Sequence, residues 1–126
     1  MPSSKRKVVR PRGSVGRGRN FESRAADFYI QQGYEILERN WQAGHKEIDL
    51  IARQGDVVAF IEVKSSHGVA FGHPAEWVTR AKIKKLIAAA SQYIVENKIE
   101  GCDFRFDVIT FEGDKMEHFP NAFQVE

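Results

Sequence analysis

The sequence contains very little cysteine and no long hydrophobic run. Cys102 is the only cysteine among 126 residues, which excludes an intramolecular disulfide and is typical of the reducing cytoplasm. We expect its side chain to be a small buried apolar group. No apolar stretch approaches the roughly 20 residues that cross a membrane, and the basic N-terminus lacks the apolar segment of a secretory signal. These absences favour a soluble cytoplasmic protein without a membrane segment.

Acidic residues are missing from positions 1–19, which carry Lys5, Arg6, Lys7, Arg10, Arg12, Arg17 and Arg19. Beyond them, 12 basic and 17 acidic residues give a formal charge of −5. The Gly, Pro and Ser content predicts a disordered basic tail over 1–19, followed by a single domain over 20–126, because this length suits one hydrophobic core. Such a tail either attracts a polyanion such as nucleic acid or only keeps the chain solvated.

The hydrophobic periodicity predicts an α/β domain in the order helix, three strands, helix, strand. Two amphipathic helices are expected, one over 21–32 with Asn20 as its N-cap and one over 79–97. Strands are expected over 34–41, 47–53, 57–64 and 103–111, with a short edge strand over 115–119. Because a helix connects the third and fourth strands, these two strands should pair in parallel within a mixed central sheet flanked by helices.

The second and third strands should form a hairpin around Gly55 and Asp56. Gly55 can supply the positive φ of a type II′ turn. The resulting register places Asp49 opposite Glu62, and Glu47 opposite Lys64. The face with these charged residues also carries Ile51, Val58 and Phe60, while the other face carries Ile48, Leu50, Ala52, Ala59, Ile61 and Val63. Both faces are therefore apolar, which indicates central strands covered on both sides.

A carboxylate pair in such a hairpin needs compensation. Like charges at paired positions destabilise a sheet, and partial burial adds a desolvation cost. Either one carboxyl is protonated or a cation lies between Asp49 and Glu62. Two carboxylates are natural ligands for Mg²⁺ or Mn²⁺, and Lys64 beside them could orient an attacking water or offset charge on a phosphate. The alternative is an exposed hairpin edge whose charged residues make surface pairs.

The segment Glu47-Ile48-Asp49-Leu50-Ile51, followed by Ile61-Glu62-Val63-Lys64, resembles the PD-(D/E)xK nuclease motif. More narrowly, the chain resembles the YraN-like uncharacterised protein family 0102, which is related to archaeal Holliday junction resolvases. The resemblance covers about residues 21–109. It is supported by Asn40, the pair Phe71-Gly72, Lys82 and the strand Arg105-Phe106-Asp107-Val108.

This resemblance implies a restriction endonuclease-like core that performs metal-dependent hydrolysis of DNA phosphodiester bonds, including branched or junction DNA. The implied catalytic residues are Asp49, Glu62 and Lys64, with Asp49 and Glu62 as metal ligands. A helix glutamate joins the metal site in resolvase relatives, and Glu22 occupies that position. Glu22 is explained nearly as well as an acidic residue favoured by the helix dipole. Resolvase relatives act as symmetric dimers, so the resemblance also implies a homodimer.

The chain departs from the family pattern beside these residues. The family has glycine where this sequence has Phe21 and Lys46, and arginine where it has Ser66. Lys46 and Ser66 favour an alternative, a nuclease-fold protein that binds nucleic acid without cutting it. A further alternative is an adaptor that binds a protein partner.

Basic residues crowd the first turns of the second predicted helix: Arg80, Lys82, Lys84 and Lys85. Cations there oppose the helix dipole, so contact with nucleic-acid phosphates explains them better than local stability does. The alternative is a solvated polar face. His67 and His73 are weak candidates for zinc ligands, because a zinc site needs more ligands at closer spacing than these two histidines provide. Trp41 and Trp77 could stack on bases, although packing roles are more common for tryptophan.

Overall fold

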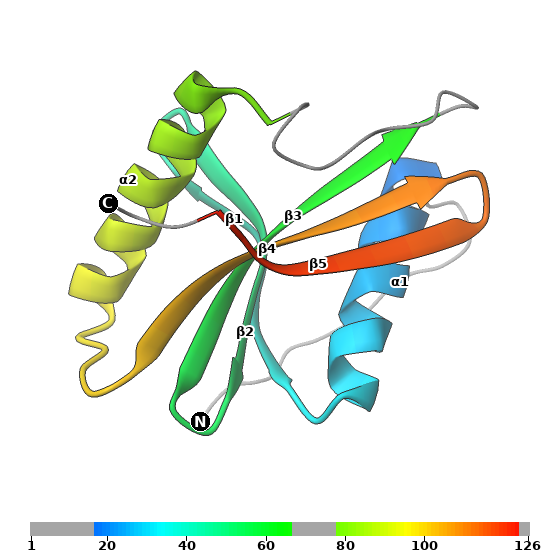
Figure 1. The fold of residues 1–126 in the computed structure, drawn as a ribbon. Helices are drawn as coiled ribbons and strands as arrows, with labels where there is room; N and C mark the ends of the chain where they lie inside the picture. Colours follow the sequence, from blue (N-terminus) through cyan, green and yellow to red (C-terminus); the bar gives the residue numbers. More distant parts are fainter. Residues whose placement is uncertain (1–16, 67–77, 124–126) are drawn as a thin grey trace.

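Five strands form one sheet, with a helix against each face (Figure 1). The computed structural model describes residues 17–66 and 78–123. Its elements are α1 (Arg17–Gln31), β1 (Glu35–Ala43), β2 (Lys46–Gln54), β3 (Val57–Ser66), α2 (Arg80–Glu96), β4 (Asp103–Glu112) and β5 (Lys115–Phe123). This order confirms the predicted α/β class and its sequence of helix, three strands, helix and strand.

The strands lie in the order β1-β2-β3-β4-β5. β3 and β4 are parallel, as predicted, because α2 carries the chain back across one face of the sheet before β4 begins. The other neighbours are antiparallel. β5 continues to Phe123 and is longer than the predicted edge strand.

The helix boundaries differ from prediction at one place. α1 begins at Arg17, so Asn20 lies inside the helix and the predicted N-cap at Asn20 is wrong. The reason is that helical backbone geometry extends through the preceding arginine-containing turn, so the cap-forming residue type at Asn20 does not mark the start. Gly33 ends the helix with φ 97°, as expected. Residues 1–16 lie outside the described residues, and the disordered tail stays a prediction.

α2 agrees closely with prediction. Thr79 is the N-cap, and its side-chain oxygen accepts a hydrogen bond from the backbone N–H of Lys82 at 3.1 Å. Asn97 is the C-cap, with its backbone N–H directed to carbonyl oxygens of the last turn. Capping at both ends satisfies backbone groups of the terminal turns and stabilises the helix.

Both faces of the sheet are buried against a helix. The first cluster joins α1 to the sheet: Ala25, Ala26, Tyr29, Leu50, Ala52, Ala59, Ile61, Ile109 and Phe111. The second joins α2 to the other face: Ile48, Ile51, Val58, Phe60, Leu86, Ala89, Ala90, Tyr93 and Phe106. Ile30, which follows the apolar spacing of α1, is nevertheless 49% exposed. Two covered faces explain why β2 and β3 are apolar on both sides.

Three smaller expectations concern single residues and the membrane. Cys102 is a free, partly buried thiol packed against the α2 cluster. Trp41 packs edge-on against the ring of Tyr93 at 5.2 Å between centroids, which supports its packing role. Within the described part of the chain, no helix is long and apolar enough to cross a membrane.

Candidate active site

The β2–β3 hairpin has the predicted register. Gly55 has φ 60°, and Gln54 pairs with Val57 across a two-residue turn. The same pairing continues to Leu50 and Ile61. The turn chemistry of Gly55 therefore determines which residues of the two strands meet.

Counted from the turn, the regular pairing of the hairpin ends at Leu50, so Asp49 is the first residue of β2 outside it. The Oδ2 atom of Asp49 accepts a hydrogen bond from the backbone N–H of Val63 at 2.8 Å. On the other side of β2, Asn40 lies between the pairs Arg39–Leu50 and Trp41–Ile48 and adopts φ 52°, a left-handed conformation that asparagine tolerates. Asp49 thus lies near Glu62. The prediction that the two residues pair directly across the strands is wrong, because they are not partners in the ladder.

The same irregularity changes the face of Ile48. The prediction placed Ile48 with Leu50 and Ala52, but Ile48 packs in the α2 cluster with Ile51. Strict alternation requires a regular strand, and it fails here because the side chain of Asp49 replaces a backbone acceptor opposite β3. The second strand is therefore distorted at the position of the candidate acid.

Asp49 is held in an environment that disfavours its charge. Burial is the largest cause, followed by the negative charge of Glu62, and together they raise the pKa of Asp49 to about 7. The hydrogen bond from Val63 opposes this rise in pKa, while the charges of Glu22 and Glu47 add to it. The structure therefore gathers three acidic residues, Glu22, Glu47 and Glu62, around the partly buried carboxyl group of Asp49.

Glu62 is buried, with 5% of its surface exposed. Its Oε2 atom lies 3.6 Å from the Nζ atom of Lys64 and 3.6 Å from the Nζ atom of Lys82. Lys64 is thus a neighbour of Glu62, as expected from their shared face, rather than a partner of Glu47. Lys82 comes from α2, and its contact with Glu62 was not predicted; its sequence position indicated only a phosphate contact.

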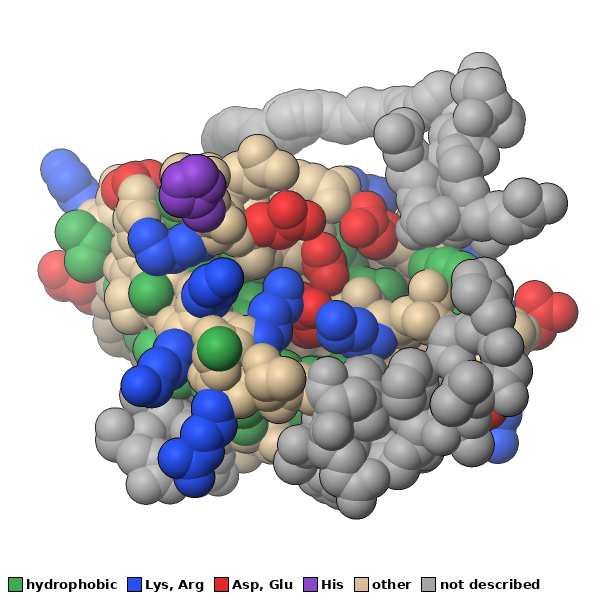
Figure 2. Space-filling model, turned by 90° about the horizontal axis from the view of Figure 1, so that it is seen from above, with side chains coloured by type: hydrophobic (Ala, Val, Ile, Leu, Met, Phe, Trp, Pro, Cys, Tyr) green, Lys and Arg blue, Asp and Glu red, His purple; other side chains and the backbone are tan. Residues whose placement is uncertain are grey.

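The candidate residues lie at one end of the sheet. β3 ends here, and both helices begin here (Figure 1). Figure 2 shows this end of the molecule, with acidic side chains gathered near its centre and Lys and Arg side chains beside them. The first turns of α1 bring Glu22 to this end, and those of α2 bring the lysines.

The donor set suits a cation that completes its coordination with water and phosphate oxygens. Mg²⁺ and Mn²⁺ bind in this way to one or two carboxylates, and Asp49 and Glu62 provide two. A closed zinc site would need four protein ligands. Within residues 17–66 and 78–123, no group of three or more His, Cys, Asp or Glu side chains is arranged to hold a metal. Asp49 and Glu62 thus offer two carboxylates, which is fewer protein ligands than a closed site needs.

The predicted phosphate contacts of α2 separate into two pairs. Lys82 and Lys85 line an open pocket next to the acidic residues. Arg80 and Lys84 are exposed and do not line this pocket. The predictions for His67, His73, Trp77 and the pair Phe71-Gly72 fall outside the described residues.

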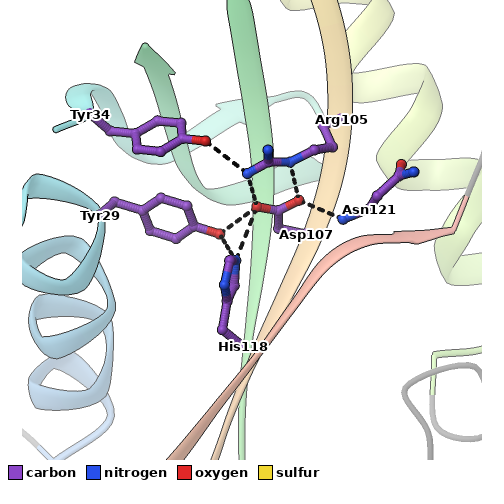
Figure 3. Close-up of polar contacts among 6 residues, drawn as sticks. All are labelled: Tyr29, Tyr34, Arg105, Asp107, His118 and Asn121. Carbon is purple, nitrogen blue, oxygen red and sulfur yellow. Dashed lines mark hydrogen bonds and ion pairs between the residues drawn. The ribbon is translucent and has the colours of Figure 1, made fainter. Parts of the chain in front are cut away.

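A second polar cluster lies on the α1 face of the sheet, centred on Asp107 (Figure 3). Asp107 is 1% exposed. It accepts hydrogen bonds from Tyr29 at 2.7 Å, from two nitrogens of Arg105 at 2.8 Å each and from the backbone N–H of Asn121 at 2.9 Å. The Nε2 atom of His118 lies 3.3 Å from Asp107 and 3.0 Å from the Tyr29 hydroxyl, and Arg105 also donates to the hydroxyl of Tyr34.

These contacts keep Asp107 ionised. Burial alone would raise its pKa, but hydrogen bonds from His118, Arg105, Asn121 and Tyr29 hold the pKa of Asp107 well below its usual range. Asp107 lies where the β4–β5 register shifts, so the N–H of Asn121 bonds to a side chain instead of a strand neighbour. The cluster joins α1, β4 and β5. Sequence spacing could not reveal this cluster, because Tyr29, Asp107 and His118 come from three different elements.

The described residues form a mixed α/β sheet between two helices, with a polar site at the end of the sheet where both helices begin. The structure is similar to that of Hjc, a Holliday junction resolvase from Archaeoglobus fulgidus, with a TM-score of 0.52 over 80% of this chain and 73% of that one. Sequence identity to Hjc is 17%, so this likeness concerns the fold. It agrees with the predicted restriction endonuclease-like core.

Sequence comparison identifies the family. The model of Uncharacterised protein family UPF0102 matches residues 21–111. A UPF0102 protein of Chloroherpeton thalassium is 44% identical over 110 residues, covering 87% of this chain and 84% of that protein. One from Sulfurihydrogenibium sp. is 39% identical, covering 87% and 96%. The chain belongs to the UPF0102 family, which confirms the resemblance found in its sequence.

Proposed function

We propose that this protein is a nuclease that depends on Mg²⁺ or Mn²⁺ and hydrolyses phosphodiester bonds of DNA, including branched DNA such as four-way junctions. The observation that carries the proposal is the juxtaposition of Asp49 with the buried Glu62 and of Glu62 with Lys64. The likeness to the fold of a Holliday junction resolvase supports junction DNA as the substrate class.

Each residue has a distinct role in this proposal. Asp49 and Glu62 would hold the cation, and Glu22, whose charge acts on Asp49, would be an auxiliary ligand that reaches the hydrated cation through a bound water. When bound, a divalent cation neutralises the carboxylates and stabilises the charge that develops on phosphate oxygens. Lys64 donates hydrogen bonds either to the attacking water or to the phosphate. Val63 orients Asp49 through its backbone N–H, which leaves the remaining lone pairs of the carboxylate for a ligand.

The basic residues of α2 complete the proposed substrate contacts. Arg80, Lys82, Lys84 and Lys85 lie at the end of the molecule that carries the acidic residues, and we assign them to contacts with the sugar-phosphate backbone. A homodimer would match a junction with two equivalent strands.

A second candidate function is nucleic-acid binding without cleavage. It is favoured by the contact of Lys82 with Glu62, because two ammonium groups at 3.6 Å already compensate this carboxylate without a metal. Under this alternative, salt-sensitive DNA binding persists in a chelator and no metal supports cleavage.

The test is cleavage of labelled single-stranded, flap and four-way-junction DNA with added Mn²⁺. We expect wild-type protein to cut at least one of these substrates. Asp49→Ala and Lys64→Ala should each reduce the rate by about 100-fold or more, because each removes a charge from the reacting centre. Asp56→Asn, at the turn end of the same hairpin, and Lys98→Gln are matched controls that should cut normally. Cleavage that survives both site substitutions would refute the assignment.

A further inference from the structure

An open pocket of about 340 Å³ lies between the β1–β2 turn and the first turns of α2. Its lining includes three lysines, one histidine and one carboxylate: His45, Lys46, Glu47, Lys82 and Lys85, together with Thr79, Ala81 and Leu86. The cations come from two separate segments of the chain. Their convergence on one hollow is therefore a product of the fold and not of a local run of basic residues.

The α2 lysines of the pocket are placed where they oppose the helix dipole. Lys82 and Lys85 are three positions apart, so they share one side of the helix. The end of α2 is already capped by the Thr79 side chain, which accepts the N–H of Lys82. An anion in the pocket would therefore be held by the lysine side chains and not by an open helix N-terminus.

Lys82 connects this pocket to the acidic residues. It lines the pocket, and its Nζ atom lies 3.6 Å from the Oε2 atom of Glu62. A ligand in the pocket is thus separated from Glu62 by a single side chain. A polymer with successive phosphates can occupy both places at once, whereas a small anion can occupy only one.

The charge of the lining indicates which kind of phosphate fits. Lys82 is already balanced by Glu62, and Glu47 offsets one of the two remaining lysines. The lysines of the pocket and these carboxylates therefore leave a formal excess of one positive charge. This matches the single charge of a backbone phosphodiester better than the double charge of a terminal phosphate monoester.

We propose that this pocket binds a backbone phosphate of a nucleic-acid strand, next along the strand to the phosphate that would be cut at Asp49 and Glu62. The inference rests on the proposed function, since it assumes that a strand reaches those carboxylates. Lys46 and Lys85 are its main contacts. Lys82 positions Glu62 as well and is therefore unsuitable for a selective test.

The test is an NMR titration of the ¹⁵N-labelled full chain in EDTA at constant ionic strength. The probes are a six-nucleotide oligothymidylate and, separately, inorganic phosphate. We expect the oligonucleotide to shift amide signals of residues 45–47 and 79–86. Lys46→Gln and Lys85→Gln should each weaken its binding about fivefold, because each removes one charge-assisted contact. Lys98→Gln, beyond the opposite end of α2, should bind within about twofold of wild type.

Two results would overturn the proposal that this pocket binds a backbone phosphate. One is unchanged oligonucleotide affinity in Lys46→Gln and Lys85→Gln, whose folding is checked in the same spectra. The other is equal binding of inorganic phosphate, which would mean a site for a free anion. A parallel cleavage assay in Mn²⁺ separates the two proposals. Equal cleavage by wild type and both variants would refute the pocket proposal but not the nuclease proposal. Oligonucleotide binding at the pocket without cleavage under any metal would refute the nuclease proposal but not the pocket proposal.

Discussion

Replacing Asp49 by asparagine is expected to raise the free energy of unfolding by about 2–4 kcal/mol at pH 8 in EDTA. The pKa of Asp49 is about 7 in the fold, against 3.8 for an unperturbed aspartate, so ionisation costs more in the folded chain than in the unfolded one. The contribution of Asp49 to wild-type stability should therefore be fully present below about pH 4 and should be lost as the pH rises from about 4 through 7. Asparagine keeps an acceptor for Val63 but carries no charge.

The measurement is urea unfolding of both proteins in EDTA at pH 5 and pH 8. The free energy of unfolding of Asp49→Asn should exceed that of the wild type by more at pH 8 than at pH 5. The stability of the variant should also vary less with pH than that of the wild type. Asp56→Asn removes an exposed charge from the same hairpin and should change stability by less than about 0.5 kcal/mol. A loss of stability at pH 8 in Asp49→Asn would show that its carboxylate is not strained in the fold.

Replacing Asp107 by asparagine is expected to lower the free energy of unfolding by about 3–5 kcal/mol at pH 7. The carboxylate accepts two hydrogen bonds from Arg105 and others from Tyr29 and Asn121. An amide nitrogen in its place would face donors and leave the guanidinium of Arg105 without its buried counter-charge. The contacts between α1, β4 and β5 would weaken together.

Thermal and urea unfolding at pH 7 measure this loss. Tyr29→Phe is the comparison, because it removes only the hydroxyl with its contacts to Asp107 and His118 and should cost about 1–2 kcal/mol. Since the pKa of Asp107 lies below its usual range, the stability it provides is present above about pH 4 and is lost as the pH falls further. In Asp107→Asn, the free energy of unfolding should fall less steeply than in the wild type as the pH is lowered below about 4. An equal effect of the two substitutions would contradict the central role of Asp107.

Local patterns in the sequence were sufficient to predict the hairpin and the layer order. Gly55 sets the turn, and the apolar residues on both faces of β2 and β3 require a helix on each side. The parallel pairing of β3 and β4 follows from the crossover helix between them. These features depend on neighbours in the chain or on general topology, which is why they could be predicted.

Features that depend on distant side chains could not be predicted. The contact of Lys82 with Glu62 joins α2 to β3, and no local spacing encodes it. The face of Ile48 was predicted wrongly, because the prediction assumed regular alternation along β2. The hydrogen bond from the Val63 N–H to the Asp49 side chain accompanies a departure from regular alternation there. The pocket at Lys46 likewise requires the β1–β2 turn and α2 to meet.

The central claim is that Asp49 and Glu62 bind a divalent cation, and calorimetric titration of the full chain with Mn²⁺ at pH 7.5 tests it most directly. Wild-type protein should bind Mn²⁺ and release protons on binding, because the cation favours the ionised form of Asp49. Asp49→Asn should lose this binding while Asp56→Asn keeps it. Absence of Mn²⁺ binding by the wild type, or equal binding by Asp49→Asn, would contradict the claim.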